Sequence, residues 1–191
     1  MGNKKIDHFY KRIQGWFHFE AVYQRAVAGA RDGARFVEIG CWKGKSTAFM
    51  ATEIANSGKK IEFFAVDHFL GIGPNQEADP AVVAGTLFEL FKKNLRPVAD
   101  YVIPMRMTSV EASKWIADDS VDFLLIDGGH DYNSVRADLD AWLPKMHDGA
   151  TVAGDDWNWS GVNRAVTESF GENVEVLGDG KTRHWRAQWK R

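Results

Sequence analysis

Five acidic residues of this 191-residue chain follow or lie at the end of short apolar segments. They are Glu38, Asp67, Asp127, Asp155 and Asp156, and the segments are 36–39, 61–66, 121–126 and 150–153. A carboxylate can accept hydrogen bonds, bind a cation or take up a proton, so acids at such repeated positions can do chemistry. If the apolar segments are strands of one parallel sheet, the acids meet at one edge and form a single site.

The densest acidic cluster combines D-G-G-H-D-Y at 127–132 with G-D-D-W at 154–157. Neighbouring strands would bring Asp127, Asp155 and Asp156 together, where three carboxylates repel one another unless a proton or a divalent cation is present. Oxygen ligands suit Mg²⁺ or Ca²⁺, with Mn²⁺ as a further option. We therefore predict a metal site at these aspartates, with Mg²⁺ favoured. The alternative is that they only form turns and cap helices.

The stretch F-V-E-I-G-C-W-K-G-K-S-T at 36–47 predicts a strand, a tight turn and a helix that bind a small molecule. A phosphate-binding P-loop requires four residues between its first glycine and G-K-[ST], whereas Gly40 and Gly44 have three between them. The dinucleotide fingerprint G-x-G-x-x-G is also absent. Because Glu38 would repel a phosphate, the stretch favours a cationic ligand.

Strand and helix patterns alternate along the chain. Strands are expected at 35–39, 61–66, 101–105, 121–126 and 150–153, followed by an antiparallel hairpin at 174–177 and 182–189. Helices are expected at 45–55, 81–94 and 160–170. A capping box of Thr108 and Glu111 predicts a further helix that ends at 116, and Asn133 or Ser134 is expected to cap another. This order predicts an α/β fold with a doubly wound, mostly parallel sheet.

Two further segments are expected to cover the strand ends. Apolar residues between 6 and 30 fit helical spacing, which predicts an N-terminal cap of two helices separated at Gly15. This cap would pack on its own chain or on a second subunit, and a homo-oligomer could form through it. The irregular segment 70–80 is expected to be a mobile lid or an ordinary surface loop.

The pattern E-I-G-C-W-K-G resembles the E/D-x-G-x-x-x-G motif of class I S-adenosylmethionine-dependent methyltransferases. The resemblance implies a Rossmann-like seven-stranded sheet that ends in an antiparallel hairpin. It also implies that Asp67 accepts hydrogen bonds from the ribose hydroxyls, that His68 lies beside the adenosine, and that Gly40 approaches the methionine part. The remaining residues implied to bind the cofactor are Glu38, Gly44, Ser46 near its carboxylate, Ser109 near adenine, and Asp127.

The motifs D-G-G-H and G-D-D are similar to those of metal-dependent small-molecule O-methyltransferases. These include catechol and macrolide-sugar enzymes and methyltransferase family 24. Asp156 stands where the catechol enzymes carry Asn, and His130 stands where they carry a lysine. The resemblance implies a small-molecule hydroxyl acceptor, with Asp127 or His130 as the base. Trp157 and Trp159 follow closely enough to line an acceptor pocket or to belong to the core.

Composition limits the remaining classes. A net charge of −2 gives no general case for binding nucleic acid or an anionic membrane, and the single cysteine excludes internal disulfides and a four-thiolate zinc site. No apolar run reaches the about 18 residues of a membrane span. We expect a soluble, cytoplasmic chain with one domain at 1–191, made of a cap at 1–30 and a core at 35–191.

Alternatives to a methyltransferase remain open from the sequence. One is an adenosyl-ligand-binding module without catalysis, and another is a metal-dependent biosynthetic enzyme of the hydroxylase-like kind that shares these motifs. A nucleotide-dependent oxidoreductase or hydrolase is disfavoured by the glycine spacing. No motif identifies the acceptor, because its contacts would come from the N-terminal residues and the 70–80 segment.

Overall fold

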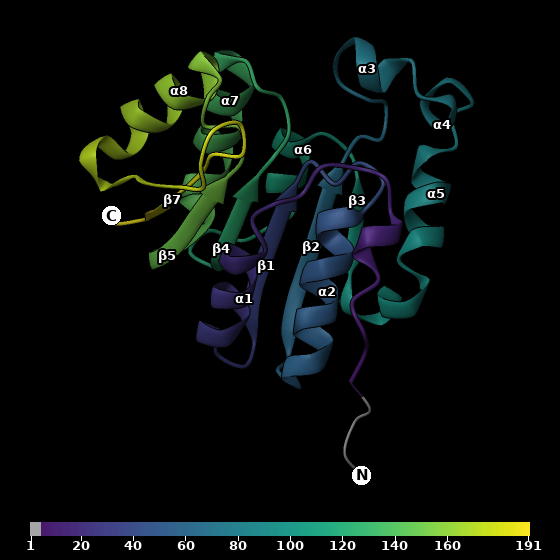
Figure 1. The fold of residues 1–191 in the computed structure, drawn as a ribbon. Coiled ribbons are helices and arrows are strands. Elements are labelled where there is room, and N and C mark those ends of the chain that lie inside the picture. The colour runs from purple at the N-terminus through teal and green to yellow at the C-terminus, as the bar shows by residue number, and fades with distance from the viewer. Residues whose placement is uncertain (1–4) are drawn as a thin grey trace.

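The apolar segments of the sequence form one seven-stranded sheet, with strand order β3-β2-β1-β4-β5-β7-β6 (Figure 1). The structure is a computed structural model that describes residues 5–191; residues 1–4, the start of the expected cap, lie outside the described residues. The first five strands are parallel, and β7 is antiparallel to both of its neighbours, as expected. The strands are β1 (Ala34–Ile39), β2 (Ile61–Asp67), β3 (Ile103–Arg106), β4 (Val121–Ile126), β5 (Met146–Gly154), β6 (Glu175–Leu177) and β7 (His184–Gln188).

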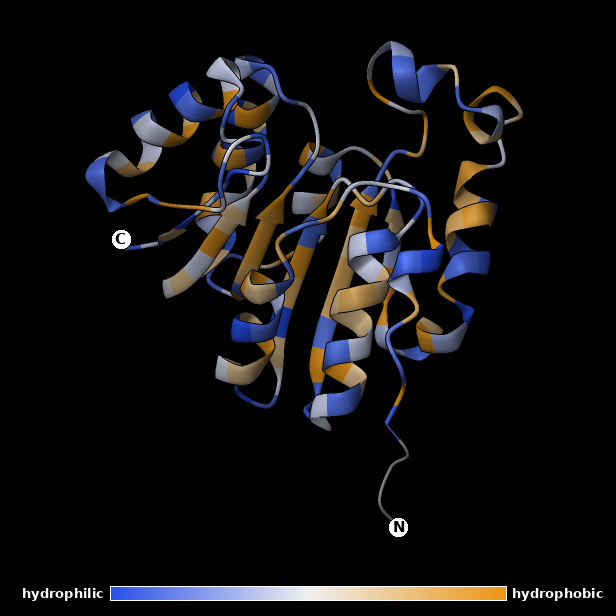
Figure 2. Cartoon of the chain, in the orientation of Figure 1, coloured by the Kyte–Doolittle hydropathy of each residue, from blue (hydrophilic) through white to orange (hydrophobic). Residues whose placement is uncertain are grey.

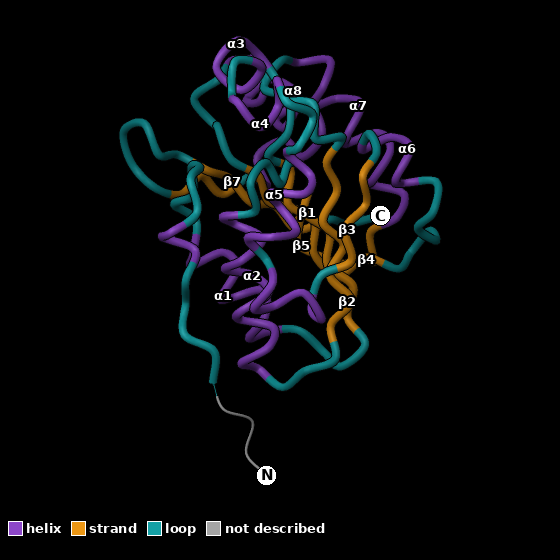
Figure 3. Tube along the Cα trace, turned by 90° about the vertical axis from the view of Figure 1, so that its right-hand side faces the viewer, coloured by secondary structure: helices purple, strands orange, loops and turns teal. Residues whose placement is uncertain are grey.

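Helices cover both faces of the sheet (Figures 1 and 3). One layer holds α1 (Glu20–Gly29), α2 (Lys45–Ser57) and α5 (Leu87–Asn94), and the other holds α6 (Ser109–Ser113), α7 (Tyr132–Trp142) and α8 (Ser160–Phe170). Shorter elements are η1 (Tyr10–Arg12), α3 (Gly73–Glu77), α4 (Pro80–Val83), η2 (Arg96–Tyr101), η3 (Leu143–Lys145) and η4 (Gly171–Asn173). Among the described residues, no helix combines the length and hydropathy needed to cross a bilayer.

The central strands are apolar on both faces because both faces are covered. Phe36, Phe63 and Phe123 pack against the α1 and α2 layer, whereas their chain neighbours Val37 and Leu124 pack against the opposite layer. Figure 2 shows these strands as mostly apolar, between helices that carry both apolar and polar residues. Continuous apolar runs are typical of parallel strands buried in this way.

The N-terminal segment differs from its expected structure. The predicted first helix is wrong: η1 is a single 3-10 turn, and residues 13–19 are irregular up to α1. Trp16 is 66% exposed, whereas Phe17 and Phe19 pack into the core, so inward and outward side chains alternate as in extended chain. This segment, purple in Figure 1, crosses the upper, carboxyl ends of the strands.

Several helix boundaries also differ. The expected helix 81–94 is interrupted at Gly85, which has a φ of 66°, and the segment 70–80 contains α3. The cap of α7 is Asp131, whose side chain accepts hydrogen bonds from two backbone N–H groups, rather than Asn133 or Ser134. The capping box of Thr108 and Glu111 is confirmed.

Candidate functional site

The strand ends form one row because the parallel strands are in register. Ile39 pairs with Val66 on one side and with Ile126 on the other, and Ile126 pairs with Gly154. The backbone pairing continues past these residues, since the N–H of Asp127 donates to the carbonyl oxygen of Ile39 over 2.8 Å. The residues that follow the pairs therefore lie side by side at the carboxyl edge: Gly40, Asp67, Asp127 and Asp155.

The loop after β1 turns at two glycines in the left-handed region. Gly40 has a φ of 87° and Gly44 has a φ of 86°, a conformation that favours glycine. A Cβ on Gly40 would lie 2.0 Å from the carbonyl oxygen of Asp127. Gly40 is therefore required by the contact between this loop and the end of β4, whether or not a cofactor is bound. The implied contacts of both glycines with a cofactor stay predictions.

Glu38 lies beneath this loop and is 1% exposed. Its Oε1 accepts a hydrogen bond from the Tyr23 hydroxyl over 2.8 Å, and its Oε2 accepts one from the Thr47 hydroxyl over 2.5 Å. Burial raises the pKa of Glu38, and hydrogen bonds from Ser46, Thr47 and Tyr23 oppose this rise. Glu38 thus connects α1, β1 and α2, and the cofactor contacts predicted for Glu38 and Ser46 stay untested.

Asp67 holds the loop through backbone amides. Its Oδ2 accepts hydrogen bonds from the N–H groups of Cys41 and Trp42 at 2.9 Å each, and its Oδ1 accepts one from Phe69 at 2.6 Å. Because a carboxylate offers about four acceptor positions, one remains for a ligand hydroxyl in this arrangement. A ribose that used both hydroxyls would have to share one of the amide-bound positions.

His68 and Ser109, both predicted to contact the cofactor, make local hydrogen bonds. The Nδ1 of His68 accepts from the N–H of Leu70 over 3.0 Å. The hydroxyl of Ser109 accepts from the indole N–H of Trp142 over 2.8 Å and donates to the buried carboxylate of Asp138. Ser109 therefore ties α6 to α7, and its contact with a cofactor stays a prediction.

The ends of β4 and β5 bring Asp127, His130 and Asp156 together. One possible ligand atom from each lies within 4.8 Å of the others, and Nε2 of His130 is 2.7 Å from Oδ2 of Asp156. Burial raises the pKa of Asp127 well above its usual value, and the charges of Asp155 and Asp156 raise it further. Asp156 in turn raises the pKa of His130. Mutually repelling carboxylates in a half-buried site are an environment that a divalent cation stabilises.

Asp155 is paired with a different histidine. Its carboxylate is 6% exposed, and its Oδ1 lies 3.0 Å from Nε2 of His18. The imidazole is not aligned for a hydrogen bond, and neither atom has a hydrogen-bond partner among the described residues. A buried carboxylate oxygen without a donor is costly, and a bound cation would offset that cost. The residues at the ends of β4 and β5 therefore fit a divalent ion.

Backbone strain also concentrates at the carboxyl edge. Four non-glycine residues of the described chain have a left-handed φ, and three of them follow strands at this edge: Trp42 at 48°, Phe69 at 59° and Asp156 at 57°. Each such residue costs about 1–3 kcal/mol and persists only where its surroundings fix it. The edge thus has the strained backbone that is common at functional sites.

Two segments cover this edge, residues 13–19 and residues 70–83. The buried ammonium of Lys43 donates to Oε1 of Gln14 over 2.6 Å and to Oδ2 of Asp79 over 2.5 Å. The ammonium of Lys45 donates to the carbonyl oxygen of Gly15 over 2.8 Å. The loop after β1 is therefore bonded to both covering segments. Whether the 70–80 segment moves as a lid stays a prediction.

Aromatic side chains near the acids differ in exposure. Trp159 is exposed, and its ring centroid lies 5.4 Å from that of His130, whereas Trp157 packs against the core. Trp16 and Leu70, in the two covering segments, are also exposed. An exposed apolar side chain therefore lies beside His130 and one lies in each covering segment, and Trp159 suits an acceptor pocket better than Trp157 does.

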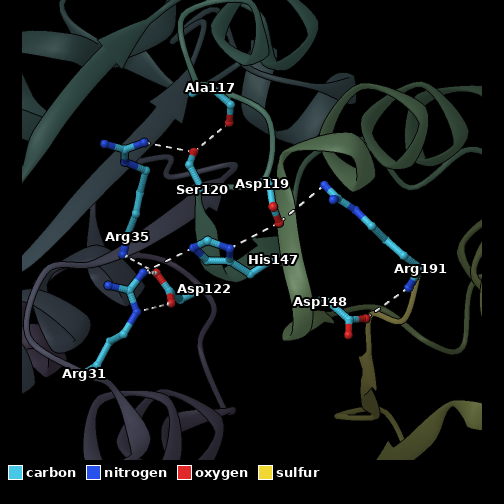
Figure 4. Close-up of polar contacts among 9 residues, drawn as sticks. All are labelled: Arg31, Arg35, Ala117, Asp119, Ser120, Asp122, His147, Asp148 and Arg191. Carbon is cyan, nitrogen blue, oxygen red and sulfur yellow. Dashed lines mark hydrogen bonds and ion pairs between the residues drawn. The ribbon is translucent and has the colours of Figure 1, made fainter.

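A cavity of about 700 Å³ lies at the opposite edge of the sheet, where the parallel strands begin. Several of its polar side chains contact one another (Figure 4): Nε of Arg31 is 3.1 Å from Oδ1 of Asp122, and Nδ1 of His147 is 3.2 Å from Oδ1 of Asp119. Because none of the strand-end acids lines this cavity, we do not assign the reaction to it.

Of the predicted ion ligands, the structure groups Asp127 and Asp156 with His130, while Asp155 contacts His18. His18 could not be found from the sequence, because it belongs to no motif and its segment has helical spacing. Tyr23 and Lys43 were also not predicted to be part of the site. Their roles depend on how α1 and the 70–83 segment pack, for which the sequence carries no local signal.

The comparisons with known proteins concern the family and the fold of the chain. The family model described as a methyltransferase domain matches residues 37–157. In sequence, the uncharacterized protein y4gI of Sinorhizobium fredii is 27% identical over 139 residues, which cover 73% of this chain and 15% of the length of that relative.

Solved structures share the fold. The O-methyltransferase NovP aligns with a TM-score of 0.66 and 20% identity over 90% of this chain and 79% of its own. An S-adenosylmethionine-dependent O-methyltransferase from Thermotoga maritima has a TM-score of 0.64 and 14% identity over 90% and 64%. A Clostridium thermocellum protein named as an rRNA methylase has a TM-score of 0.61 and 13% identity over 90% and 94%. The family match covers more than half of the chain, and the protein therefore belongs to methyltransferase family 24, within the class I S-adenosylmethionine-dependent methyltransferases.

Proposed function

We propose that the protein transfers the methyl group of S-adenosylmethionine to a hydroxyl group of a small molecule, with a divalent ion at the ends of β4 and β5. The observation that supports this most strongly is the group formed by Asp127, His130 and Asp156, beside the buried carboxylate of Asp155. These acids lie directly beside the glycine loop through the contact of Gly40 with Asp127.

The β1 and β2 ends form the cofactor half in this proposal. Asp67 would accept a ribose hydroxyl at its remaining acceptor position, and the loop 40–44 would lie along the methionine part. Ser46, His68 and Ser109 would contribute contacts around the cofactor. The proposal treats residues 35–191 as one catalytic domain with the N-terminal residues as its cover.

The β4 and β5 ends form the reactive half. When bound, S-adenosylmethionine would supply an electrophilic methyl group, and a divalent ion held by Asp127, Asp155 and Asp156 would lower the pKa of the acceptor hydroxyl. Transfer of the methyl group to the acceptor oxygen would break its bond to sulfur and leave S-adenosylhomocysteine. Nε2 of His130 or the carboxylate of Asp127 takes the hydroxyl proton.

The first experiment is calorimetric titration of S-adenosylmethionine with and without Mg²⁺, followed by a methyl-transfer assay. The assay panel holds sugars, catechols and glycosides, and an RNA because one protein of the same fold is named as an rRNA methylase. The proposal predicts cofactor binding and ion-dependent transfer to a hydroxyl. If S-adenosylmethionine does not bind even at high concentration, the proposal is wrong.

Other outcomes identify the alternatives. Cofactor binding without transfer to any acceptor would indicate a binding module, and a product that gains oxygen instead of a methyl group would indicate a hydroxylase-like enzyme. An Asp155→Ala, Asp156→Ala double variant tests the ion separately. Full activity in that variant would contradict the role of the metal ion, while the proposed methyl transfer from S-adenosylmethionine would remain.

A further inference from the structure

Lys43, in the loop after β1, has a side chain that is only 7% exposed. Lysine is almost never buried to this extent unless its ammonium has a partner. The backbone around it is fixed from two directions. Asn94 of α5 donates to the carbonyl oxygen of Lys43 over 2.9 Å, and Asp67 accepts from the N–H groups of the two preceding residues. The loop therefore holds the ammonium at one point, and the groups around that point decide what Lys43 can do.

Both segments that cover the carboxyl edge bind this ammonium. It donates to Oε1 of Gln14 in the 13–19 segment over 2.6 Å and to Oδ2 of Asp79 in the 70–83 segment over 2.5 Å. Nζ also lies 5.2 Å from the centroid of the Trp42 ring, within reach of a cation–π contact. One side chain thus joins the two covering segments to each other and to the loop.

The contact with Asp79 is an ion pair between two nearly buried groups. The carboxylate of Asp79 is 9% exposed, and the hydrogen bond from Lys43 lowers its pKa below the usual value, so Asp79 is charged at neutral pH. Separating the two charges without water would leave each of them unpaired, which is costly. The cost is much lower if the 70–83 segment moves outward, because water then reaches both groups.

The 70–83 segment is attached to the rest of the molecule by few contacts. Neither α3 nor α4 contains a buried residue, and Ala81 and Val82 are only partly buried where they pack against the core. Of the hydrogen bonds that the segment makes among the described residues, only the one from Lys43 reaches beyond residues 68–86. Lys43 is therefore its main polar contact with the rest of the chain.

Glycines lie near both ends of this segment. Gly71 has a φ of 76° and Gly85 has a φ of 66°, both in the left-handed region. Because glycine lacks the Cβ that restricts other residues, it can absorb a change in backbone angles at the ends of a moving segment. The segment can therefore move outward about its ends once the contact with Lys43 breaks.

We propose that Lys43 is the latch of the candidate site: its contacts with Gln14 and Asp79 hold both covering segments closed, and the cofactor enters and leaves when these contacts break. This inference rests on the function proposed above, because it takes S-adenosylmethionine to lie along the loop 40–44 under the covering segments. Lys43 is then a positioning residue that controls binding and takes no part in methyl transfer itself.

Hydrogen exchange in the full chain, without added ligand, tests the latch itself. Asp79→Asn removes the charge partner of Lys43 but keeps a side-chain oxygen that can cap α4, as the carboxylate of Asp79 does. We expect exchange of the Val83 amide and, through Lys43, of the Ile13 amide to become at least about tenfold faster. A rise at both amides identifies one latch, because a local effect of the substitution would stay within 70–83.

Two more variants complete this test. Gln14→Met removes the acceptor on the other covering segment and should also speed exchange of the Val83 amide; it replaces Asp79→Asn if the latter does not fold. Asp118→Asn is the matched control, since it removes a lysine–aspartate pair, with Lys145 at 2.6 Å, at the opposite edge of the sheet. It should leave both amides unchanged. Thermal unfolding of each variant checks the fold.

Stopped-flow fluorescence with S-adenosylmethionine supplies the second readout. Entry and exit both require the latch to open, so Asp79→Asn should raise the association and the dissociation rate constants together, by about tenfold each, with Kd nearly unchanged. A residue that only contacted the cofactor would change mainly the dissociation rate constant.

The inference is overturned if exchange of the Val83 and Ile13 amides keeps its wild-type rate in both Asp79→Asn and Gln14→Met, or if only dissociation of S-adenosylmethionine becomes faster. If the wild type does not bind S-adenosylmethionine, the proposed function and the control of cofactor entry both fail. The exchange rates then still decide whether Lys43 holds the covering segments closed.

Discussion

The acids in the two halves of the carboxyl edge differ in their hydrogen-bond donors. In the β1 and β2 half, hydroxyl groups donate to both oxygens of Glu38, and backbone amides donate to both oxygens of Asp67. In the β4 and β5 half, an oxygen of Asp155 has no donor among the described residues, and Asp127 is repelled by its acidic neighbours. The chain supplies neutral hydrogen-bond donors to the first set of acids, whereas the imidazoles of His18 and His130 lie against acids of the second set.

In the function proposed above, the first half is a scaffold and the second half is the reactive centre. Acids with protein donors stabilise the fold and hold the glycine loop in one conformation before any ligand binds. Acids without such donors cost stability and persist where a bound group offsets the cost. Substitutions should therefore affect activity in the second half and stability in the first.

The largest effect is expected from Asp156→Asn in the second half. Methyl transfer should fall about 10³-fold, because ion-assisted stabilisation is worth several kcal/mol. The melting temperature should change little, since the substitution removes a repelling charge beside Asp127 and also the ion pair of Asp156 with His130. Assays of transfer and of thermal unfolding on the same preparation check this. A variant that lost stability and kept activity would reverse the assignment of the two halves.

A Gly40→Ala variant should disturb both halves at once. The added Cβ would meet the carbonyl oxygen of Asp127 at 2.0 Å, so we expect a loss of about 3 kcal/mol or more in the free energy of unfolding. Gly58→Ala is the matched control: Gly58 has a φ of 69° but no atom within 4 Å of its added Cβ, and the cost should be about 1 kcal/mol. Equal losses in denaturant unfolding would show that backbone strain, not the contact with β4, requires Gly40.

Asp138, a buried acid of α7, allows a test by the pH dependence of stability. Burial raises its pKa from 3.8 to about 6, and the Ser109 hydroxyl only partly opposes this. Between pH 4 and 6 the folded state binds the proton more tightly than the unfolded state, so stability falls as pH rises through this window. The cost is complete above pH 6, at most about 3 kcal/mol.

The corresponding variant is Asp138→Asn. It should gain stability over the wild type at pH 7, and the gain should vanish below about pH 4, where both states of the wild type are protonated. Denaturant unfolding across this range measures the difference. A gain that was largest at acidic pH would contradict the buried, unneutralised state of Asp138.

The smallest effect is expected from Tyr23→Phe in the first half. The substitution removes one donor from the buried carboxylate of Glu38, which should cost about 1–2 kcal/mol of unfolding free energy. Tyr10→Phe is the control, because the Tyr10 hydroxyl donates to the less buried Glu20 and should cost less. If both variants were equally stable, the hydrogen bond from Tyr23 to Glu38 would contribute no more to stability than an exposed one, and the proposed stabilising role of the first half would be wrong.

The acids of both halves could be predicted because apolar runs show where parallel strands end. The glycine loop and the capping box of Thr108 and Glu111 are equally local patterns, and the structure has the expected fold at each. The hydrogen-bond partners of the acids could not be predicted. Tyr23 reaches Glu38 only because α1 packs across β1, and no spacing in the sequence specifies that contact.

The N-terminal segment shows a conflict between two patterns. Aromatic and aliphatic residues between 9 and 27 fit helical spacing, while the alternation at 16–19 is too short to outweigh it in sequence. In the structure, Phe17 packs on Phe49 of α2 and Phe19 is buried beside Tyr23, and this packing keeps the chain extended over the strand ends. His18 faces Asp155 as a consequence of that tertiary contact.

The most direct test of the division between the halves is calorimetry on Asp67→Asn and Asp156→Asn, each titrated with S-adenosylmethionine and with Mn²⁺. The account predicts a crossover: Asp67→Asn weakens binding of S-adenosylmethionine about tenfold and leaves Mn²⁺ binding intact, whereas Asp156→Asn abolishes Mn²⁺ binding and leaves the cofactor bound. Equal losses of both ligands in both variants, or a wild type that binds neither, would contradict it.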